Sequence, residues 1–214
     1  TPLGLLGEIL LFAPDDGVHG TEPWRTDGTP DGTFLLGDLT SGSAPSQVSP
    51  LGVLDGEFLL AVSDGSSTAL WKTDGTVSGT IAVGPMPTWA SSGIELGGAL
   101  VFSGSDAVHG AELWRTDGTA AGTTLLKDIN PAGPSSAYPV ARLGDRVVIW
   151  ADDGTHGFEP WATDGTPTGT ILLRDINPGP AMSLGSRTVV LGPTLFFWAY
   201  DGVHGFELWK TDGT

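Results

Sequence analysis

The sequence predicts an all-β fold, a β-propeller of about five four-stranded antiparallel blades. Gly and Pro contribute 33 and 16 of the 214 residues, which argues against a mostly helical chain. The motif Trp-Xaa-Thr-Asp-Gly-Thr recurs five times, at spacings of 43 to 48 residues. Short apolar segments alternate with Gly, Asp and Pro turn signals between these motifs. A four-stranded meander repeated every 40 or so residues is the sequence signature of a propeller.

The repeated motif divides the chain into five units. Its tryptophans are Trp24, Trp71, Trp114, Trp161 and Trp209, and its aspartates are Asp27, Asp74, Asp117, Asp164 and Asp212. We expect one propeller domain over residues 1–214, with repeats at about 1–49, 50–91, 92–138, 139–186 and 187–214. The motif tryptophans are predicted to be core residues, because burial of an indole stabilises a fold by about 1.5 to 3 kcal/mol.

Within each unit the first two predicted strands form a hairpin. A tight turn such as Gly144-Asp145 joins them. The second strands are 9–13, 58–62, 99–103, 147–151 and 195–199, and they are apolar on both faces. Such a strand must be covered on both sides, because neither of its faces suits water.

The third and fourth strands of each unit are predicted from the alternation of side chains and from the turn between the two strands. Residues 112–116 place Glu, Trp and Thr on one face and Leu and Arg on the other, because side chains alternate at period two. Asp117-Gly118 makes the next turn, and 123–129 forms the fourth strand. The fifth repeat stops after its third strand, so its blade is predicted to lack one outer strand. An open array or a β-solenoid is the rival architecture.

Composition excludes several kinds of protein. Nine Lys and Arg against 25 Asp and Glu give a formal net charge of -16, which disfavours binding to the phosphates of nucleic acids. No cysteine is present, which excludes disulfides and thiolate metal sites. No apolar run reaches the roughly 18 residues of a membrane span. Because the sequence starts at Thr1 without a signal-peptide pattern, we expect a processed form or a fragment.

The repeats resemble those of the bacterial ELWxxDGT-repeat proteins, also called hyalin-like, over nearly the whole chain. The motif begins Glu-Pro-Trp-Arg at Glu22, Ala-Leu-Trp-Lys at Ala69, Glu-Leu-Trp-Arg at Glu112, Glu-Pro-Trp-Ala at Glu159 and Glu-Leu-Trp-Lys at Glu207. The second copy departs most from the pattern, because Ser-Ser-Thr-Ala replaces its His-Gly-Xaa-Glu segment. The resemblance implies a secreted or cell-surface repeat protein and implies no catalytic activity.

Four histidines share one repeat position, three residues before a Glu. They are His19, His109, His156 and His204. A metal site is one interpretation, but a bound ion needs ligands that converge on one point. We therefore favour a structural role, in which each imidazole ties its loop to a neighbouring strand. Calcium stays an alternative for the Asp-Gly loops, although no EF-hand or nonapeptide calcium repeat is present. No cofactor is otherwise expected.

Catalytic motifs do not appear in the sequence. It has no nucleophile elbow, no zinc-protease helix motif and no phosphate-binding loop. Carboxylate pairs such as Asp152-Asp153 recur with the repeat, whereas a catalytic site should break the symmetry. We predict that the chain is not an enzyme.

Three tryptophans outside the motif break the repeat symmetry. Trp150 and Trp198 replace Ala or Ser of the other repeats, and Trp89 lies in a connection. Indole faces stack on sugar rings, so these three are the candidate ligand-binding residues. The alternative is that Trp150 and Trp198 fill space between blades and that Trp89 anchors a loop.

We therefore expect a secreted or surface module for recognition or adhesion. In the first hypothesis it is lectin-like and binds carbohydrate between or on top of the blades, with a glycan or a surface protein as partner. In the second it is a structural or protein-interaction scaffold. The two differ in whether Trp150 and Trp198 are exposed beside polar groups or buried among Leu and Phe.

Overall fold

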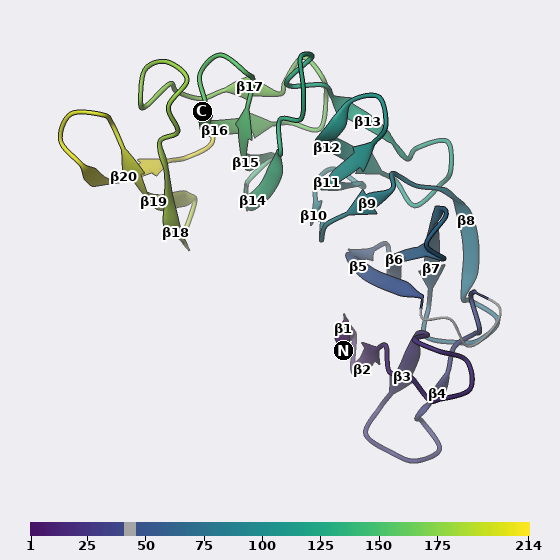
Figure 1. Cartoon of the computed structure of the whole chain (residues 1–214). Helices are drawn as coiled ribbons and strands as arrows, with labels where there is room; N and C mark the ends of the chain where they lie inside the picture. The colour runs from purple at the N-terminus through teal and green to yellow at the C-terminus, as the bar shows by residue number, and fades with distance from the viewer. Residues whose placement is uncertain (41–45) are drawn as a thin grey trace. The chain divides into compact units, whose positions relative to one another are not determined.

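The computed structural model describes residues 1–40 and 46–214, and the side chains of 184–186 are outside this description. The described residues form twenty β-strands and no helix, which confirms the all-β prediction (Figure 1). By backbone proximity the chain divides into two units. The first contains residues 1–92 and 116–123, and the second contains 93–115 and 124–214.

The first unit holds two antiparallel sheets in simple meander order. Sheet 1 follows the order β1-β2-β3-β4, with β1 (Pro2–Leu6), β2 (Ile9–Phe12), β3 (Trp24–Thr26) and β4 (Phe34–Leu35). Sheet 2 follows the order β5-β6-β7-β8, with β5 (Gln47–Leu54), β6 (Glu57–Ser63), β7 (Thr68–Thr73) and β8 (Ile81–Pro85). The short strand β9 (Trp89–Ala90) comes next in the chain.

The second unit holds three more sheets of the same kind. Sheet 3 runs β10-β11-β12-β13, with β10 (Ile94–Glu95), β11 (Leu100–Asp106), β12 (Gly110–Thr116) and β13 (Thr124–Lys127). Sheet 4 runs β14-β15-β16-β17, with β14 (Tyr138–Leu143), β15 (Arg146–Asp152), β16 (Phe158–Thr163) and β17 (Ile171–Leu172). Sheet 5 runs β18-β19-β20, with β18 (Leu184–Leu191), β19 (Thr194–Tyr200) and β20 (Phe206–Thr211).

These five sheets match the predicted repeat, including the missing strand of the last one. The antiparallel meander differs from the parallel stacking of a β-solenoid, and no sheet closes on itself among the described residues, so the open array stays an alternative. Among the described residues no helix is long and apolar enough to cross a membrane. The prediction of a single domain over residues 1–214 stays a prediction.

The second strand of each sheet is the centre of its packing. In β15, Val147 and Ile149 point to one face and Val148 and Trp150 to the other, and all four are buried. Both faces of the strand are therefore covered, as the sequence predicts.

Within each unit, a sheet packs on the next one through opposite faces of these second strands. In the first unit, Leu11 and Ala13 of β2 share a core cluster with Phe58 and Leu60 of β6. We call the face that carries Leu11 and Ala13 the trailing face, and the face that carries Phe58 and Leu60 the leading face. The second unit has two clusters of the same kind. In one, the trailing face of sheet 3 packs on the leading face of sheet 4. In the other, the trailing face of sheet 4 packs on the leading face of sheet 5.

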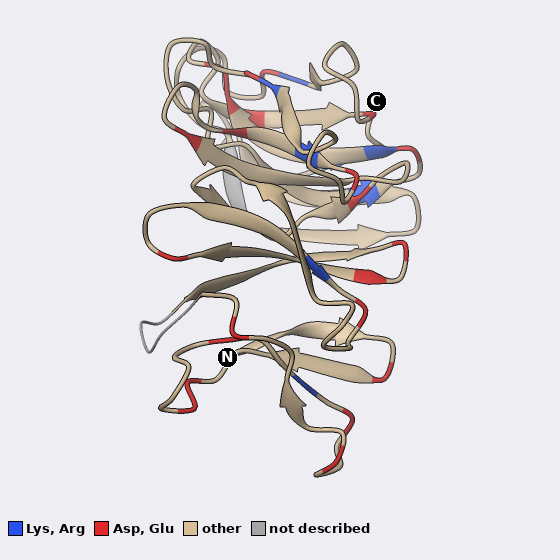
Figure 2. Ribbon diagram, turned by 90° about the vertical axis from the view of Figure 1, so that its right-hand side faces the viewer, with Lys and Arg blue, Asp and Glu red and all other residues tan. Residues whose placement is uncertain are grey.

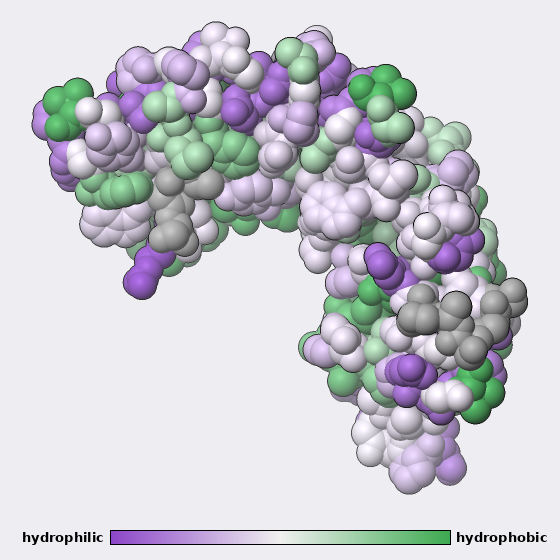
Figure 3. Space-filling view, viewed as in Figure 1, coloured by the Kyte–Doolittle hydropathy of each residue, from purple (hydrophilic) through white to green (hydrophobic). Residues whose placement is uncertain are grey.

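The trailing face of sheet 5 is open, unlike its counterparts. Six exposed apolar or aromatic side chains lie on it, beside the half-buried Thr194 and Phe196 and the exposed Lys210: Val189, Leu191, Trp198, Tyr200, Phe206 and Leu208. Leu208 is 60% exposed, whereas Leu113, which holds the same repeat position in sheet 3, is fully buried. Figure 3 shows hydrophobic atoms on the surface where β18 to β20 lie in Figure 1. Six apolar or aromatic side chains therefore meet solvent on one face.

The motif tryptophans are less buried than the sequence predicts. Trp161 is buried within a core cluster, Trp71 and Trp209 are half-buried and pack against core clusters, and Trp24 and Trp114 are half-buried. Each lies on the third strand, outside the second strand that forms the centre of the packing. A cation covers the indole in two cases. The Lys127 amino group lies 5.8 Å from the ring centre of Trp161, and the Arg174 guanidinium lies 5.5 Å from that of Trp209.

Candidate functional site

The Asp-Gly-Thr part of the motif builds a closed turn. In each copy one carboxylate oxygen of the Asp accepts a hydrogen bond from the hydroxyl of the Thr two residues later, at 2.6–2.7 Å. The Thr hydroxyl in turn accepts a hydrogen bond from the backbone N–H of a later Gly, as in Gly79 to Thr76 at 3.0 Å. These bonds lower the pKa of Asp74. The motif carboxylates are therefore used within their own turns.

The later Gly of the repeat is required by this turn. A Cβ at Gly32, Gly79, Gly122 or Gly169 would lie 1.9–2.0 Å from the carboxylate oxygen of the motif Asp. Only a residue without a side chain leaves room for the carboxylate, which explains why Gly-Thr recurs after each of the first four motifs.

The four histidines close a second type of turn. In each, the ring Nδ1 and the backbone N–H of the His lie within hydrogen-bond distance of the Asp three residues earlier, as in His156 to Asp153 at 2.7 and 2.8 Å. The partner is thus in the same turn, whereas the sequence interpretation placed it on a neighbouring strand. The hydrogen bond from Asp153 raises the pKa of His156. Each imidazole therefore has its partner within its own turn.

A buried glutamate anchors the connection between sheets. Glu112 is fully buried, and its carboxylate accepts hydrogen bonds from the N–H of Ile129 at 2.9 Å and from the N–H and hydroxyl of Ser135 at 2.8 and 2.6 Å. Glu22 and Glu159 form the same kind of anchor. Burial raises the pKa of Glu112, and the hydrogen bonds oppose this rise. The carboxylate therefore joins the third strand to the segment that leads into the next sheet.

The sequence analysis did not predict that this glutamate anchors the connection between sheets. The available signal was its constant place two residues before the motif Trp in four of the five copies. The second copy, which has Ala69 there, ties its connection differently, through a hydrogen bond from the Thr68 hydroxyl to the carbonyl of Thr88 at 3.0 Å. In the last copy Glu207 is exposed.

The three candidate ligand-binding tryptophans lie in three different environments. Trp150 is 1% exposed and packs edge-on against Phe197, with ring centres 5.3 Å apart. A buried indole offers no face to a sugar. Trp150 instead fills the core between sheets 4 and 5, so its assignment as a ligand-binding residue is wrong. Trp198 is 43% exposed on the open trailing face of sheet 5, and Trp89 is 52% exposed in β9. No common site is built from the three.

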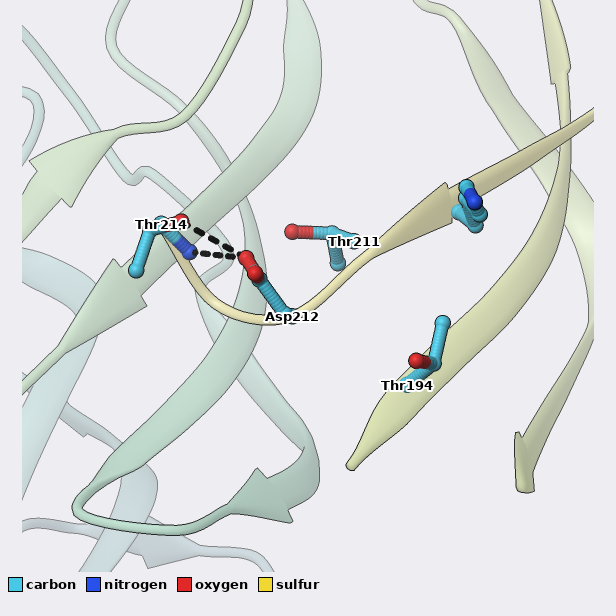
Figure 4. Close-up of a pocket in the computed structure, with 5 residues that line it drawn as sticks. Thr194, Thr211, Asp212 and Thr214 are labelled. Atoms are coloured by element: carbon cyan, nitrogen blue, oxygen red, sulfur yellow. Dashed lines mark hydrogen bonds between the residues drawn. The ribbon is translucent and has the colours of Figure 1, made fainter. Parts of the chain in front are cut away.

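Two cavities of the second unit are small and polar. One of about 250 Å³ lies beside the end of β20, lined by Thr194, Lys210, Thr211, Asp212 and Thr214. Figure 4 shows Asp212 accepting both hydrogen bonds of Thr214 there, so this carboxylate is already engaged. A neighbouring cavity of about 240 Å³ is lined in part by Arg174 and Trp209. Pockets for small-molecule ligands usually measure about 300 to 1,000 Å³.

Carboxylates are plentiful, but they are distributed along the chain. Figure 2 shows Asp and Glu mostly at the turns and strand ends. Within residues 1–40 and 46–214, no three His, Asp or Glu side chains are grouped in a way that would hold a metal ion. Calcium therefore gains no support from the geometry and stays an untested alternative.

No protein-family model and no curated protein matches the sequence. Solved structures do match the fold. A puromycin-hydrolyzing peptidase of Mycobacterium tuberculosis matches with a TM-score of 0.59 and 14% identity, over 97% of this chain and 34% of that one. Prolyl oligopeptidase B of Galerina marginata matches with a TM-score of 0.58 and 11% identity, over 99% and 34%. TolB of Acinetobacter baumannii matches with a TM-score of 0.53 and 12% identity, over 100% and 52%.

These likenesses concern the fold. The chain spans about a third to a half of the length of the three proteins, and its identity to each is below 15%. Together with the five antiparallel sheets they show a β-propeller type of architecture. They show no shared activity, because one fold carries many functions.

The glutamate anchor yields a first prediction. Glu159→Gln should lower the free energy of unfolding by about 1 to 3 kcal/mol, because the new amide group cannot accept from every donor that now faces the carboxylate. Glu207→Gln is the matched control at the exposed copy and should change stability by less than about 0.5 kcal/mol. Urea denaturation measures both. Equal effects of the two substitutions would contradict the anchor.

The His-Asp turns predict a dependence on pH. A histidine with a raised pKa stabilises the folded turn most below its ordinary value of 6.5, and this contribution is lost as pH rises through the raised pKa. NMR titration of the ring protons should give pKa values above 6.5 for His109 and His156. Asp153→Asn should return the pKa of His156 towards 6.5 and leave that of His109 unchanged. A pKa of His156 that does not respond to this substitution would refute the pairing.

Proposed function

We propose that the chain is a non-enzymatic scaffold for protein interactions. The observation that carries this proposal is the open trailing face of sheet 5, where six apolar or aromatic side chains are exposed. The corresponding face of sheet 4, which includes Trp150 and Leu143, is buried. Contiguous exposed apolar surface of this kind is typical of protein interaction sites.

The surroundings of Trp198 favour a protein over a sugar as the partner. Its cross-strand neighbour is Leu208, and Tyr200 and Phe206 pack together next to this pair, with ring centres 5.6 Å apart. Sugar sites need polar groups placed to bind hydroxyls beside an aromatic face. Most neighbours on this face are apolar or aromatic, and Lys210 is the polar exception beside Phe196, which supports the scaffold hypothesis over the lectin hypothesis.

Two other parts of the proposal, the lack of catalysis and the location outside the cell, rest on the hydrogen bonds of the turns and on the sequence. The polar side chains of the repeats are engaged in turns and anchors, which supports a chain without a catalytic site. The resemblance to ELWxxDGT-repeat proteins supports a secreted or cell-surface location. Carbohydrate binding through Trp198 or Trp89 is the second candidate, because both indoles are exposed.

Two screens test the proposal. Peptides selected from a displayed library against the chain should be apolar, and Leu208→Asp should weaken their binding at least about tenfold, because the charge lies in the centre of the face. Val108→Asp is the control, since Val108 is exposed on a turn away from this face. A glycan array, with and without calcium, should show no binding.

Two results would contradict the proposal. Peptide binding that survives Leu208→Asp would show that the face is not the interaction surface. Glycan binding that Trp198→Ala or Trp89→Ala abolishes, in a variant with an unchanged circular dichroism spectrum, would establish the lectin hypothesis instead.

A further inference from the structure

We infer that the Asp55-Gly56 peptide is the site at which this chain forms isoaspartate, a spontaneous modification that reroutes the backbone through the side chain of an aspartate. The substrate is the peptide itself, and water is the only other reactant. The inference goes beyond the proposed function and does not depend on it.

The reaction joins a carboxyl group to the next backbone nitrogen. The Gly56 nitrogen attacks Cγ of the protonated Asp55 carboxyl, the N–Cγ bond forms and a Cγ–O bond breaks. The hydroxyl leaves with the amide proton as one water. A second water then opens the five-membered succinimide, either at the side-chain carbonyl, which restores aspartate, or at the backbone carbonyl, which gives isoaspartate. A glycine favours the attack because it has no side chain that shields the nitrogen.

Most Asp-Gly pairs of the chain are held by hydrogen bonds. The sequence contains eleven such pairs, so it does not single one out. In nine of them the carboxylate accepts a hydrogen bond from the backbone N–H two residues later, at 2.8–3.1 Å. These aspartates are Asp16, Asp27, Asp64, Asp74, Asp117, Asp153, Asp164, Asp201 and Asp212. The reaction consumes the carboxylate, so each of the nine must give up this bond to react.

The same hydrogen bonds keep these carboxylates ionised. They lower the pKa of Asp74, and they lower that of Asp64 to about 2. An ionised carboxylate is a poor target for a nucleophile, because its charge repels the attacking nitrogen and an oxide would have to leave. The nine pairs are therefore protected by their own turns.

Asp55-Gly56 lacks this protection. The two residues are the central pair of the hairpin between β5 and β6, and strand pairing resumes with Leu54 and Glu57 on either side. Both are exposed, and within residues 1–40 and 46–214 neither the Asp55 carboxylate nor the Gly56 N–H takes part in a hydrogen bond. A Cβ placed at Gly56 would have no atom within 4 Å. The carboxyl and the nitrogen are both free to react.

Asp31-Gly32 separates these two requirements. Asp31 is exposed, and its carboxylate likewise accepts no hydrogen bond from the described residues. Gly32, however, is buried, and its N–H donates a hydrogen bond to the Thr29 hydroxyl at 3.0 Å. The nitrogen is engaged in this pair, so a free carboxylate alone does not make it a site.

The modification should loosen sheet 2. Isoaspartate adds one methylene to the backbone of a two-residue turn, whose length sets the register of the two strands. Leu54 is buried directly before the turn, and Glu57 directly after it forms an ion pair with Lys72 at 2.8 Å. Both contacts depend on that register.

Incubation of the 214-residue chain in mildly acidic buffer, followed by fragmentation mass spectrometry of its peptides, tests the inference. Isoaspartate should accumulate at Asp55 at least about tenfold faster than at Asp64 or Asp74, because these two must lose hydrogen bonds to a charged group. A peptide lighter by one water marks the succinimide. In urea, which unfolds the chain, the three rates should become similar.

Three results would overturn the inference. They are equal rates at Asp55, Asp64 and Asp74 in the folded chain, a faster rate at Asp31 than at Asp55, and an unmodified Asp55 after a time in which the urea-unfolded chain reacts there.

Two variants of the turn complete the test. Asp55→Gly removes the reactive carboxyl and copies Gly97-Gly98 of the equivalent hairpin in sheet 3, where both residues have a positive φ. After incubation the wild type should unfold at a lower urea concentration than before, and Asp55→Gly should be unchanged. Asp55→Asn should form the same succinimide faster, with loss of ammonia, because an amide is neutral without protonation. Equal losses of stability in wild type and Asp55→Gly would place the damage elsewhere and contradict the inference.

Discussion

The structure depends on one constraint, which is that the second strand of each sheet is apolar on both faces. A strand of this kind is stable only between two other layers, because water suits neither face. Within each unit the chain meets the constraint by packing the trailing face of one sheet on the leading face of the next, as Trp150 and Phe197 do between sheets 4 and 5. The trailing face of sheet 5 differs, because side chains such as Trp198 and Leu208 are exposed there.

Polar side chains hold this arrangement in register. The motif Asp and Thr close the turn after each third strand, and the His-Asp pair closes the turn before it. The buried Glu then fixes the connection that leads to the next sheet. These contacts explain why so acidic a chain folds. Many of its carboxylates accept hydrogen bonds from nearby N–H and hydroxyl groups, which compensate for the proximity of like charges.

The sequence predicted the fold because the fold is repeated. Five copies of one motif revealed the strand order, the turns and the incomplete last sheet, and the two-sided apolar pattern of segments such as 147–151 predicted their burial. The site was less predictable. Trp150 and Trp198 hold the same repeat position, so the sequence treated them alike, yet Trp150 is buried against sheet 5 and Trp198 is 43% exposed. Exposure depends on packing against other sheets, and a local sequence pattern does not contain that information.

The central claim, that packing between successive sheets stabilises the chain, is tested most directly by one pair of substitutions. Leu113 and Leu208 occupy the same repeat position, buried in sheet 3 and exposed in sheet 5. Measured by urea denaturation at a concentration where the chain is monomeric, Leu113→Ala should lower the free energy of unfolding by about 2 to 5 kcal/mol. Leu208→Ala should lower it by less than about 0.5 kcal/mol. Similar losses for both would show that stability lies within single sheets and would contradict the account.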